Sequence, residues 1–214
     1  MTIDEAYSII SHDKPPIIYI SGKTSTGKST FGRKLRDELD YTIIEIEAVL
    51  LEIIKSHQYD EQSTFRAVLS DPDDSEAKKL FLKEIHIVIA DILHQNKPVV
   101  IEGAVANTET LRRILDFNDT VFFLYFHPIS IDIYIRNLTQ RFMESSADSY
   151  GGLPMKFWQM IDKNEFATFC KNRQITDGLH ASIRQYALAS QAESLTRLAE
   201  CRQYFDTITL IEIS

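Results

Sequence analysis

The residues from Gly22 to Ser29 have the types and spacing needed to bind phosphate. Four residues separate Gly22 from the run Gly27-Lys28-Ser29, which is the order G-x-x-x-x-G-K-S. Glycines at these positions let the main chain bend so that successive N–H groups point into one concavity. The lysine would reach the β- and γ-phosphates of a nucleotide, and the serine hydroxyl would bind Mg²⁺. The pattern therefore predicts a phosphate-binding loop.

The segments on either side of this loop support the prediction. The apolar and β-prone run at 16–21 predicts a strand that leads into the loop. Residues 28–39 predict a helix with Phe31, Leu35 and Leu39 on one face. The loop would then lie at a helix N-terminus, where unsatisfied amides and the helix dipole attract anions. An ordinary strand-to-helix turn that binds nothing is the alternative, and the two flanking elements make it the weaker interpretation.

Nine residues of this segment are expected to contact the nucleotide. Most would act through backbone N–H groups, so the side chains at the variable positions are expected to be replaceable. The hydroxyl of Thr30 is expected to lie near the α-phosphate. The nine residues are Gly22, Lys23, Thr24, Ser25, Thr26, Gly27, Lys28, Ser29 and Thr30.

Composition and charge argue against several other classes of function. The net charge of −8 and the pI of about 5.3 argue against a broad basic surface for nucleic acid. The longest apolar runs are only strand-length, and the acidic N-terminus lacks the apolar core of a signal peptide. Cys170 and Cys201 lack metal-binding spacing and are expected to be reduced thiols. A cytoplasmic protein without nucleic-acid or membrane partners is therefore expected.

Strands and helices alternate along the whole chain. Further strands are predicted at 41–46, 99–103, 120–126 and 206–213. Further helices are predicted at 2–11, 48–56, 75–96, 107–116, 130–145 and 177–203, and an aromatic-rich helical segment is predicted at 155–171. This alternation indicates an α/β protein with a parallel sheet. No repeat or linker divides the chain, so residues 1–214 are expected to form a single domain. The roughly 80 residues between the last two strands exceed one crossover helix and suggest a lid or substrate-binding region.

The chain resembles the P-loop kinases, which include nucleoside, nucleotide, shikimate and chloramphenicol-type phosphotransferases. The resemblance is strong at 22–30 and fair at 45–48 and 99–103. It implies a three-layer α/β/α fold with a five-stranded parallel sheet in the order 2-3-1-4-5. It also implies a helical lid between strands 4 and 5, at about 130–178. The implied activity is phosphoryl transfer from Mg²⁺-ATP to a small acceptor.

The resemblance also assigns roles to acidic residues at the strand ends. The strand at 99–103 is similar to the one that carries the family's metal-site carboxylate, which implies that Glu102 orients a Mg²⁺-bound water beside Ser29. Glutamate in place of aspartate leaves direct metal ligation open. Glu45 and Glu47 end the second strand, where the family often holds an acid that orients or deprotonates the acceptor hydroxyl. Glu47 begins the next helix and is favoured for that role. Solvated acids at strand ends are the alternative.

Lid arginines are the third implied feature. In the family they close over the transferred phosphoryl group and neutralise charge on its oxygens. Arg136 and Arg141 lie on the helix predicted after the fourth strand. Because they are five residues apart they point in different directions, so both cannot hold one phosphate unless the helix breaks. Arg173 and Arg184 are alternatives. Exposed arginines paired with nearby acids are the competing interpretation.

The leading hypothesis is therefore an ATP-dependent kinase for a small hydroxyl- or phosphate-bearing acceptor. Its catalytic residues would be Lys28, Glu47, Arg136 and Arg141, with ATP and Mg²⁺ as cofactors. A nucleotide-binding switch or regulatory ATPase is the alternative, although the N-K-x-D motif of a GTPase is missing. A kinase fold that binds without catalysis is a third interpretation, and the intact Lys28 and Ser29 argue against it. The acceptor, the preferred base and the oligomeric state are left open.

Overall fold

Five parallel strands form the central sheet of the computed structural model, which describes residues 1–57, 76–95, 97–103, 121–144, 153–203, 205 and 207–213. The strands are β1 (Ile17–Gly22), β2 (Thr42–Glu45), β3 (Val99–Glu102), β4 (Val121–Pro128) and β5 (Ile208–Ile213). Their spatial order is β2-β3-β1-β4-β5, and every adjacent pair is parallel. The α/β class and the predicted order 2-3-1-4-5 are confirmed.

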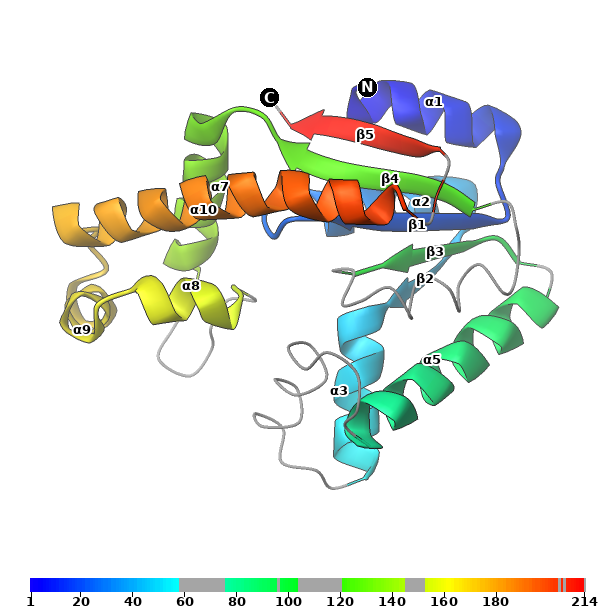
Figure 1. Ribbon diagram of the computed structural model, residues 1–214, viewed down its shortest axis with the longest axis horizontal. Coiled ribbons are helices and arrows are strands. Elements are labelled where there is room, and N and C mark those ends of the chain that lie inside the picture. The colour runs from blue at the N-terminus through cyan, green and yellow to red at the C-terminus, as the bar shows by residue number, and fades with distance from the viewer. Residues whose placement is uncertain are drawn as a thin grey trace.

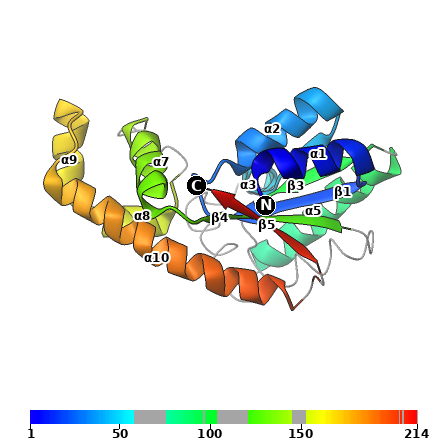
Figure 2. The ribbon, with the colours of Figure 1, turned by 90° about the horizontal axis from the view of Figure 1, so that it is seen from above.

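Helices cover both faces of this sheet, which gives the expected three layers (Figure 1, Figure 2). One face is covered by α1 (Ile3–Asp13) and α2 (Lys28–Leu39), and the other by α3 (Ile46–Ser56), α5 (Glu76–His94) and the C-terminal half of α10 (Asp177–Cys201). Alternation along the strands produces this arrangement. In β1, Ile18 and Ile20 are buried with α1 and α2, while Ile17 and Tyr19 are buried with the helices of the opposite layer.

Three further helices gather around the N-terminal half of α10, beyond one end of the sheet (Figure 1). They are α7 (Ile131–Met143), α8 (Met155–Met160) and α9 (Lys163–Asn172). Together with α10 they enclose a second hydrophobic core, in which the ring of Phe142 contacts those of Phe157, Trp158, Phe166 and Phe169. These three helices lie in the segment that was expected to form a lid or substrate-binding region.

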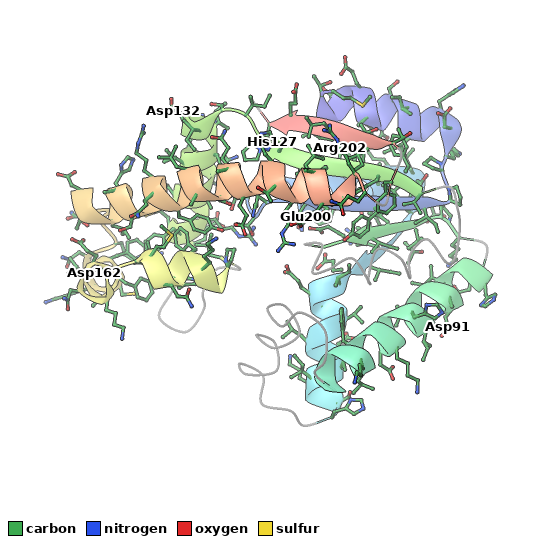
Figure 3. The ribbon with its side chains drawn as sticks, in the orientation of Figure 1. Asp91, His127, Asp132, Asp162, Glu200 and Arg202 are labelled. Atoms are coloured by element: carbon green, nitrogen blue, oxygen red, sulfur yellow. The ribbon has the colours of Figure 1, made fainter. Side chains whose placement is uncertain are left out.

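The aromatic-rich helical segment predicted at 155–171 consists of two helices, α8 and α9. Asp162 lies between α8 and α9, at the position labelled in Figure 3. Its carboxylate accepts hydrogen bonds from the backbone N–H groups of Asn164 and Glu165, at 2.8 and 3.1 Å. This N-cap starts a new helix. Aromatic residues occur on both sides of Asp162. Apolar periodicity alone therefore does not show that one helix ends and another begins there.

The other described elements agree with the predicted ones to within two residues at each end. The helix predicted at 107–116 lies outside the described residues. Among the helices of the described segments, none combines the length and the apolar character needed to cross a membrane.

Two glycines set the path of the chain between β1 and α2. Gly22 has φ +131°, and a Cβ atom there would lie 2.3 Å from the backbone oxygen of Phe126 on β4. Gly27 has φ +91° directly before α2, and a Cβ atom there would meet no heavy atom within 4 Å. Gly22 is therefore required for both conformation and space, whereas Gly27 is required for conformation alone.

We expect Gly22→Ala to destabilise the protein more than Gly27→Ala. Alanine at position 27 carries only the penalty of a left-handed backbone, about 1–2 kcal/mol. Alanine at position 22 adds a collision with main-chain atoms, which cannot rotate away. Urea denaturation followed by circular dichroism measures both losses. Equal losses in the two variants would contradict the close contact at Gly22.

Candidate phosphate-binding site

The loop between β1 and α2 closes around the carbonyl oxygen of Lys23. The Lys28 ammonium and the Thr26 hydroxyl each donate a hydrogen bond to this oxygen, both at 2.6 Å. Thr26 is buried, and Ser25 adopts a left-handed conformation with φ +61°. From α7, the side-chain amide of Asn137 donates to the Ser25 carbonyl oxygen at 3.4 Å. The loop is therefore held both by its own side chains and by α7.

Acidic residues gather beside the loop, at the carboxyl ends of β2 and β3. Glu45 and Glu102 are register partners on these strands, and the Ser29 hydroxyl donates a hydrogen bond to Glu102 Oε1 at 2.8 Å. Glu47 lies in the first turn of α3. Burial raises the pKa of Glu102; the Ser29 hydrogen bond and the Lys28 charge oppose this rise, and the charges of Glu45 and Glu47 add to it. The three carboxylates and the lysine are thus close enough for their charges to affect the pKa values of Glu102 and Lys28.

Ser29 and Glu102 offer the oxygen ligands that Mg²⁺ prefers. One is a hydroxyl at the start of α2 and the other is a carboxylate at the end of β3, and the two are in hydrogen-bonding contact. No group of three or more acidic, histidine or cysteine side chains that could hold a metal ion occurs in the described part of the chain. The donor set fits an ion that takes one or two protein ligands and completes its shell with water and phosphate oxygens.

The Lys28 ammonium is turned into the loop, and burial lowers its pKa to about 8. The negative charges of Glu102 and Glu47 oppose this lowering, whereas the positive charges of Arg141 and Lys23 add to it. Near neutral pH the group is therefore a cation that has lost much of its hydration. Such a cation attracts a phosphate more strongly than an exposed one does, because the local dielectric constant is lower.

A cavity of about 450 Å³ opens between the loop and α7, and its size is typical of small-molecule sites. The residues that line it on the side of the loop and α2 are Ser25, Gly27, Lys28, Ser29, Thr30 and Arg33. Those that line it on the side of α7 are Asn137, Gln140, Arg141 and Glu144. Loop residues predicted to contact nucleotide therefore face one arginine of the predicted lid.

The predicted arginines do not lie together. α7 is continuous through both Arg136 and Arg141, so the two side chains lie on different faces of it. Arg141 lines the cavity beside the loop, whereas Arg136 and Arg184 line a separate cavity of about 500 Å³ between α7 and α10. Arg173 follows α9 and donates a hydrogen bond to the Met143 carbonyl oxygen at the end of α7. The structure thus brings only Arg141 of these four to the loop.

Two further residues of the site, Asn137 and Glu193, were not predicted from the sequence. Asn137 lies four residues before Arg141, and this spacing on a helix could have indicated that the two share a face. Glu193 of α10 pairs with Lys23, whose ammonium lies 2.9 Å from its carboxylate. No sequence signal links these two distant residues. The Lys23 side chain, expected to be replaceable, therefore has a defined contact outside the loop.

No family model matches this chain, and no curated protein matches it in sequence. Several solved structures resemble its fold. TT1252 from Thermus thermophilus is 16% identical, with a TM-score of 0.50, and the match covers 94% of this chain and 89% of that one. A gluconokinase from Sinorhizobium meliloti 1021 is 11% identical, with a TM-score of 0.46, over 94% of this chain and 83% of that one. A shikimate kinase from Bacteroides thetaiotaomicron is 17% identical, with a TM-score of 0.43, over 85% and 81%.

At these identities the likeness concerns the fold alone. The order of the five parallel strands, and the passage from β1 through a glycine-rich loop into α2, are those expected from the resemblance. The chain therefore has the three-layer α/β/α fold, with a five-stranded parallel sheet and a glycine-rich loop between β1 and α2, that the resemblance implies.

Replacing Lys28 with methionine should stabilise the protein without nucleotide near neutral pH. The folded state holds the lysine pKa at about 8, below its ordinary value of 10.5. Burial of the cation therefore opposes folding below pH 8. As the pH rises from about 8 to about 10.5, the folded protein loses this proton before the unfolded chain does, so the penalty fades.

We expect Lys28→Met to gain up to about 3 kcal/mol over wild type at neutral pH. The gain should shrink as the pH approaches the ordinary lysine pKa. Denaturation curves of both proteins across this range measure the difference, and taking the difference removes the titration of groups that the two proteins share. A gain that stays constant with pH would contradict the burial of a charged Lys28.

Proposed function

We propose that this protein is an ATP-dependent phosphotransferase. It would transfer the γ-phosphoryl group of Mg²⁺-ATP to a small acceptor that bears a hydroxyl or phosphate group, such as a nucleoside, a nucleotide or another metabolite. The observation that carries the proposal is the meeting of Lys28, Ser29 and Glu102 beside a cavity whose opposite wall holds Arg141. Phosphoryl transfer requires mainly such positioned charges.

The phosphates of ATP would lie along the loop at the N-terminus of α2. Backbone N–H groups of the loop would donate hydrogen bonds to them. The Lys28 ammonium would exchange its bond to the Lys23 carbonyl oxygen for bonds to the β- and γ-phosphates. Arg141 would approach the γ-phosphate from the α7 side of the cavity. Two cations on the transferring group would stabilise the charge that spreads over its oxygens in the transition state.

Ser29 and Glu102 would hold the Mg²⁺ ion that accompanies ATP, and that ion supplies further neutralisation of phosphate charge. The Ser29 hydroxyl already donates to Glu102 Oε1. The carboxylate therefore fixes the orientation of the hydroxyl that would become a metal ligand, as partners of ligating groups commonly do.

The acceptor would bind near the carboxyl ends of β2 and β3, where open α/β sheets form their ligand crevice. We propose Glu47 as the residue that orients its hydroxyl, because it lies in the first turn of α3, directly after β2, and its charge helps to raise the pKa of Lys28. The hydroxyl oxygen would attack the γ-phosphorus as its proton passes to the carboxylate, and ADP would leave with the bridging oxygen. Residues 130–178 would act as a lid within a single domain.

A screen of acceptors tests this proposal. The protein would be incubated with Mg²⁺-ATP and panels of nucleosides, nucleotides, sugars and hydroxy acids, and ADP release would be measured with mass spectrometry of the products. We expect at least one class of acceptor to raise ADP release and to gain a phosphoryl group. Lys28→Met and a chelator of Mg²⁺ should each abolish the reaction. ADP release that no acceptor changes would instead support a regulatory ATPase, and calorimetry that detects no ATP binding would reject both functions.

Two arginines on one helix provide a matched comparison. Arg141→Ala should lower turnover on the order of 100-fold, as loss of one transition-state charge contact commonly does. Arg136→Ala should leave turnover close to that of wild type, because Arg136 lines the other cavity. Steady-state rates of the two variants with the acceptor found in the screen measure this. A loss of turnover in Arg136→Ala alone would instead assign the role of the lid arginine to Arg136, in the cavity between α7 and α10.

A further inference from the structure

Lys23 connects the phosphate-binding loop to the helices beside it. Its carbonyl oxygen accepts the hydrogen bonds from Lys28 and Thr26, both at 2.6 Å. Its side chain reaches α10, where its ammonium lies 2.9 Å from Glu193 Oε2. Lys23 thus contacts Lys28 through its main chain and Glu193 through its side chain. A shift of Lys23 would therefore also shift the Lys28 ammonium.

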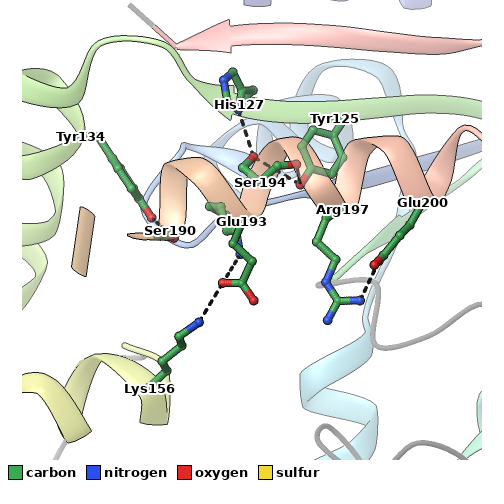
Figure 4. Close-up of polar contacts among 10 residues, drawn as sticks. Tyr125, His127, Tyr134, Lys156, Ser190, Glu193, Ser194, Arg197 and Glu200 are labelled. Carbon is green, nitrogen blue, oxygen red and sulfur yellow. Dashed lines mark hydrogen bonds and ion pairs between the residues drawn. The ribbon is translucent and has the colours of Figure 1, made fainter. Parts of the chain in front are cut away.

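Glu193 holds two lysines that come from different elements. Its Oε2 atom also lies 3.2 Å from the ammonium of Lys156 on α8, and Figure 4 draws this contact as a dashed line. Lys23 is the more enclosed partner, since its side chain is 17% exposed and that of Lys156 is 58% exposed. Burial lowers the pKa of Lys23, and the hydrogen bond and charge of Glu193 oppose that effect, whereas the positive charges of Arg197 and Lys156 add to it. Glu193 is thus the anion that helps to keep a largely buried loop residue charged.

The helix on either side of Glu193 is fixed to the rest of the protein (Figure 4). Ser190 Oγ lies 3.0 Å from the hydroxyl of Tyr134 on α7. Ser194 Oγ lies 3.0 Å from His127 Nδ1 on β4. Both serines are buried, and buried polar groups keep their partners because leaving one unpaired is costly. Glu193 therefore projects from a segment of α10 whose position is set by β4 and α7.

We propose that Glu193 is a positioning residue for the phosphate-binding loop, acting through Lys23 on Lys28. Without the carboxylate, the enclosed Lys23 ammonium would lack its anion and would turn toward solvent. That movement would displace the main chain of the loop at Lys23, and with it the Lys28 ammonium that this main chain holds in place before ATP binds. Through Lys156 the same carboxylate also ties α8 to the loop. The catalytic meaning of this role rests on the proposed function, whereas the contact between Glu193 and Lys23 does not.

Glu193→Gln tests the proposal, with Glu200→Gln as its matched control. Both changes replace a carboxylate on α10 by an amide of the same shape. Glu200 pairs with Arg197 at 3.0 Å in an exposed ion pair that includes no loop residue. In nucleotide-free protein, the backbone amide resonances of Lys23 to Ser29 should shift in Glu193→Gln and stay in place in Glu200→Gln. In calorimetry with Mg²⁺-ATP, Glu193→Gln should bind about tenfold more weakly and Glu200→Gln like wild type.

A double-mutant cycle shows whether Lys23 transmits the effect. Glu193→Gln should weaken ATP binding no further once Lys23→Met is present. Additive losses would overturn the proposal, and so would loop resonances that do not move in Glu193→Gln. If Glu193→Gln fails to fold, Glu193→Asp takes its place, and its shorter side chain should also displace the loop resonances. A wild-type protein that binds no ATP would reject the proposed function, and the loop resonances would still decide the role of Glu193.

Discussion

The burial of a charged lysine inside a tight loop is the constraint on which the rest of this site depends. Taking an ammonium out of water opposes folding unless anions or carbonyl oxygens replace the water. For Lys28 the replacements are the carbonyl oxygen of Lys23 and the charges of Glu102 and Glu47. These groups come from the loop itself, from β3 and from α3. The loop can therefore exist in this form only where those elements meet.

The order of the strands creates that meeting point. β1 lies between β3 and β4, so its carboxyl end adjoins the ends of both neighbours. On the β3 side, the register places Glu102 beside Ile20 and Glu45 beside Glu102. On the β4 side, Gly22 lies against Phe126. The chain continues from β4 into α7, which carries Arg141. A parallel sheet thus gathers carboxylates on one side of the loop and a cation on the other, as expected where ligands bind at strand ends.

The sequence predicts the local parts of this arrangement and misses those that depend on packing. The spacing from Gly22 to Ser29 indicates the loop because its geometry is set within a few residues. Helical geometry shows that Arg136 and Arg141 point in different directions, but which of them reaches the loop depends on how α7 sits against β4. The pairing of Lys23 with Glu193 is beyond prediction for a similar reason. It requires the position of α10, which is set by contacts with several other elements.

α10 shows why polar contacts, in addition to apolar ones, decide such positions. Its C-terminal half contributes Leu198 and Cys201 to the core beneath the sheet, and its N-terminal half contributes Leu179 and Ile183 to the core shared with α7, α8 and α9. Apolar packing is non-directional and by itself leaves room for a helix to slide or rotate. The buried hydroxyls between the two halves make directional hydrogen bonds to β4 and α7, which remove that freedom. The carboxylate that meets the loop projects from this same stretch, so the geometry of the loop depends on the junction of the two cores.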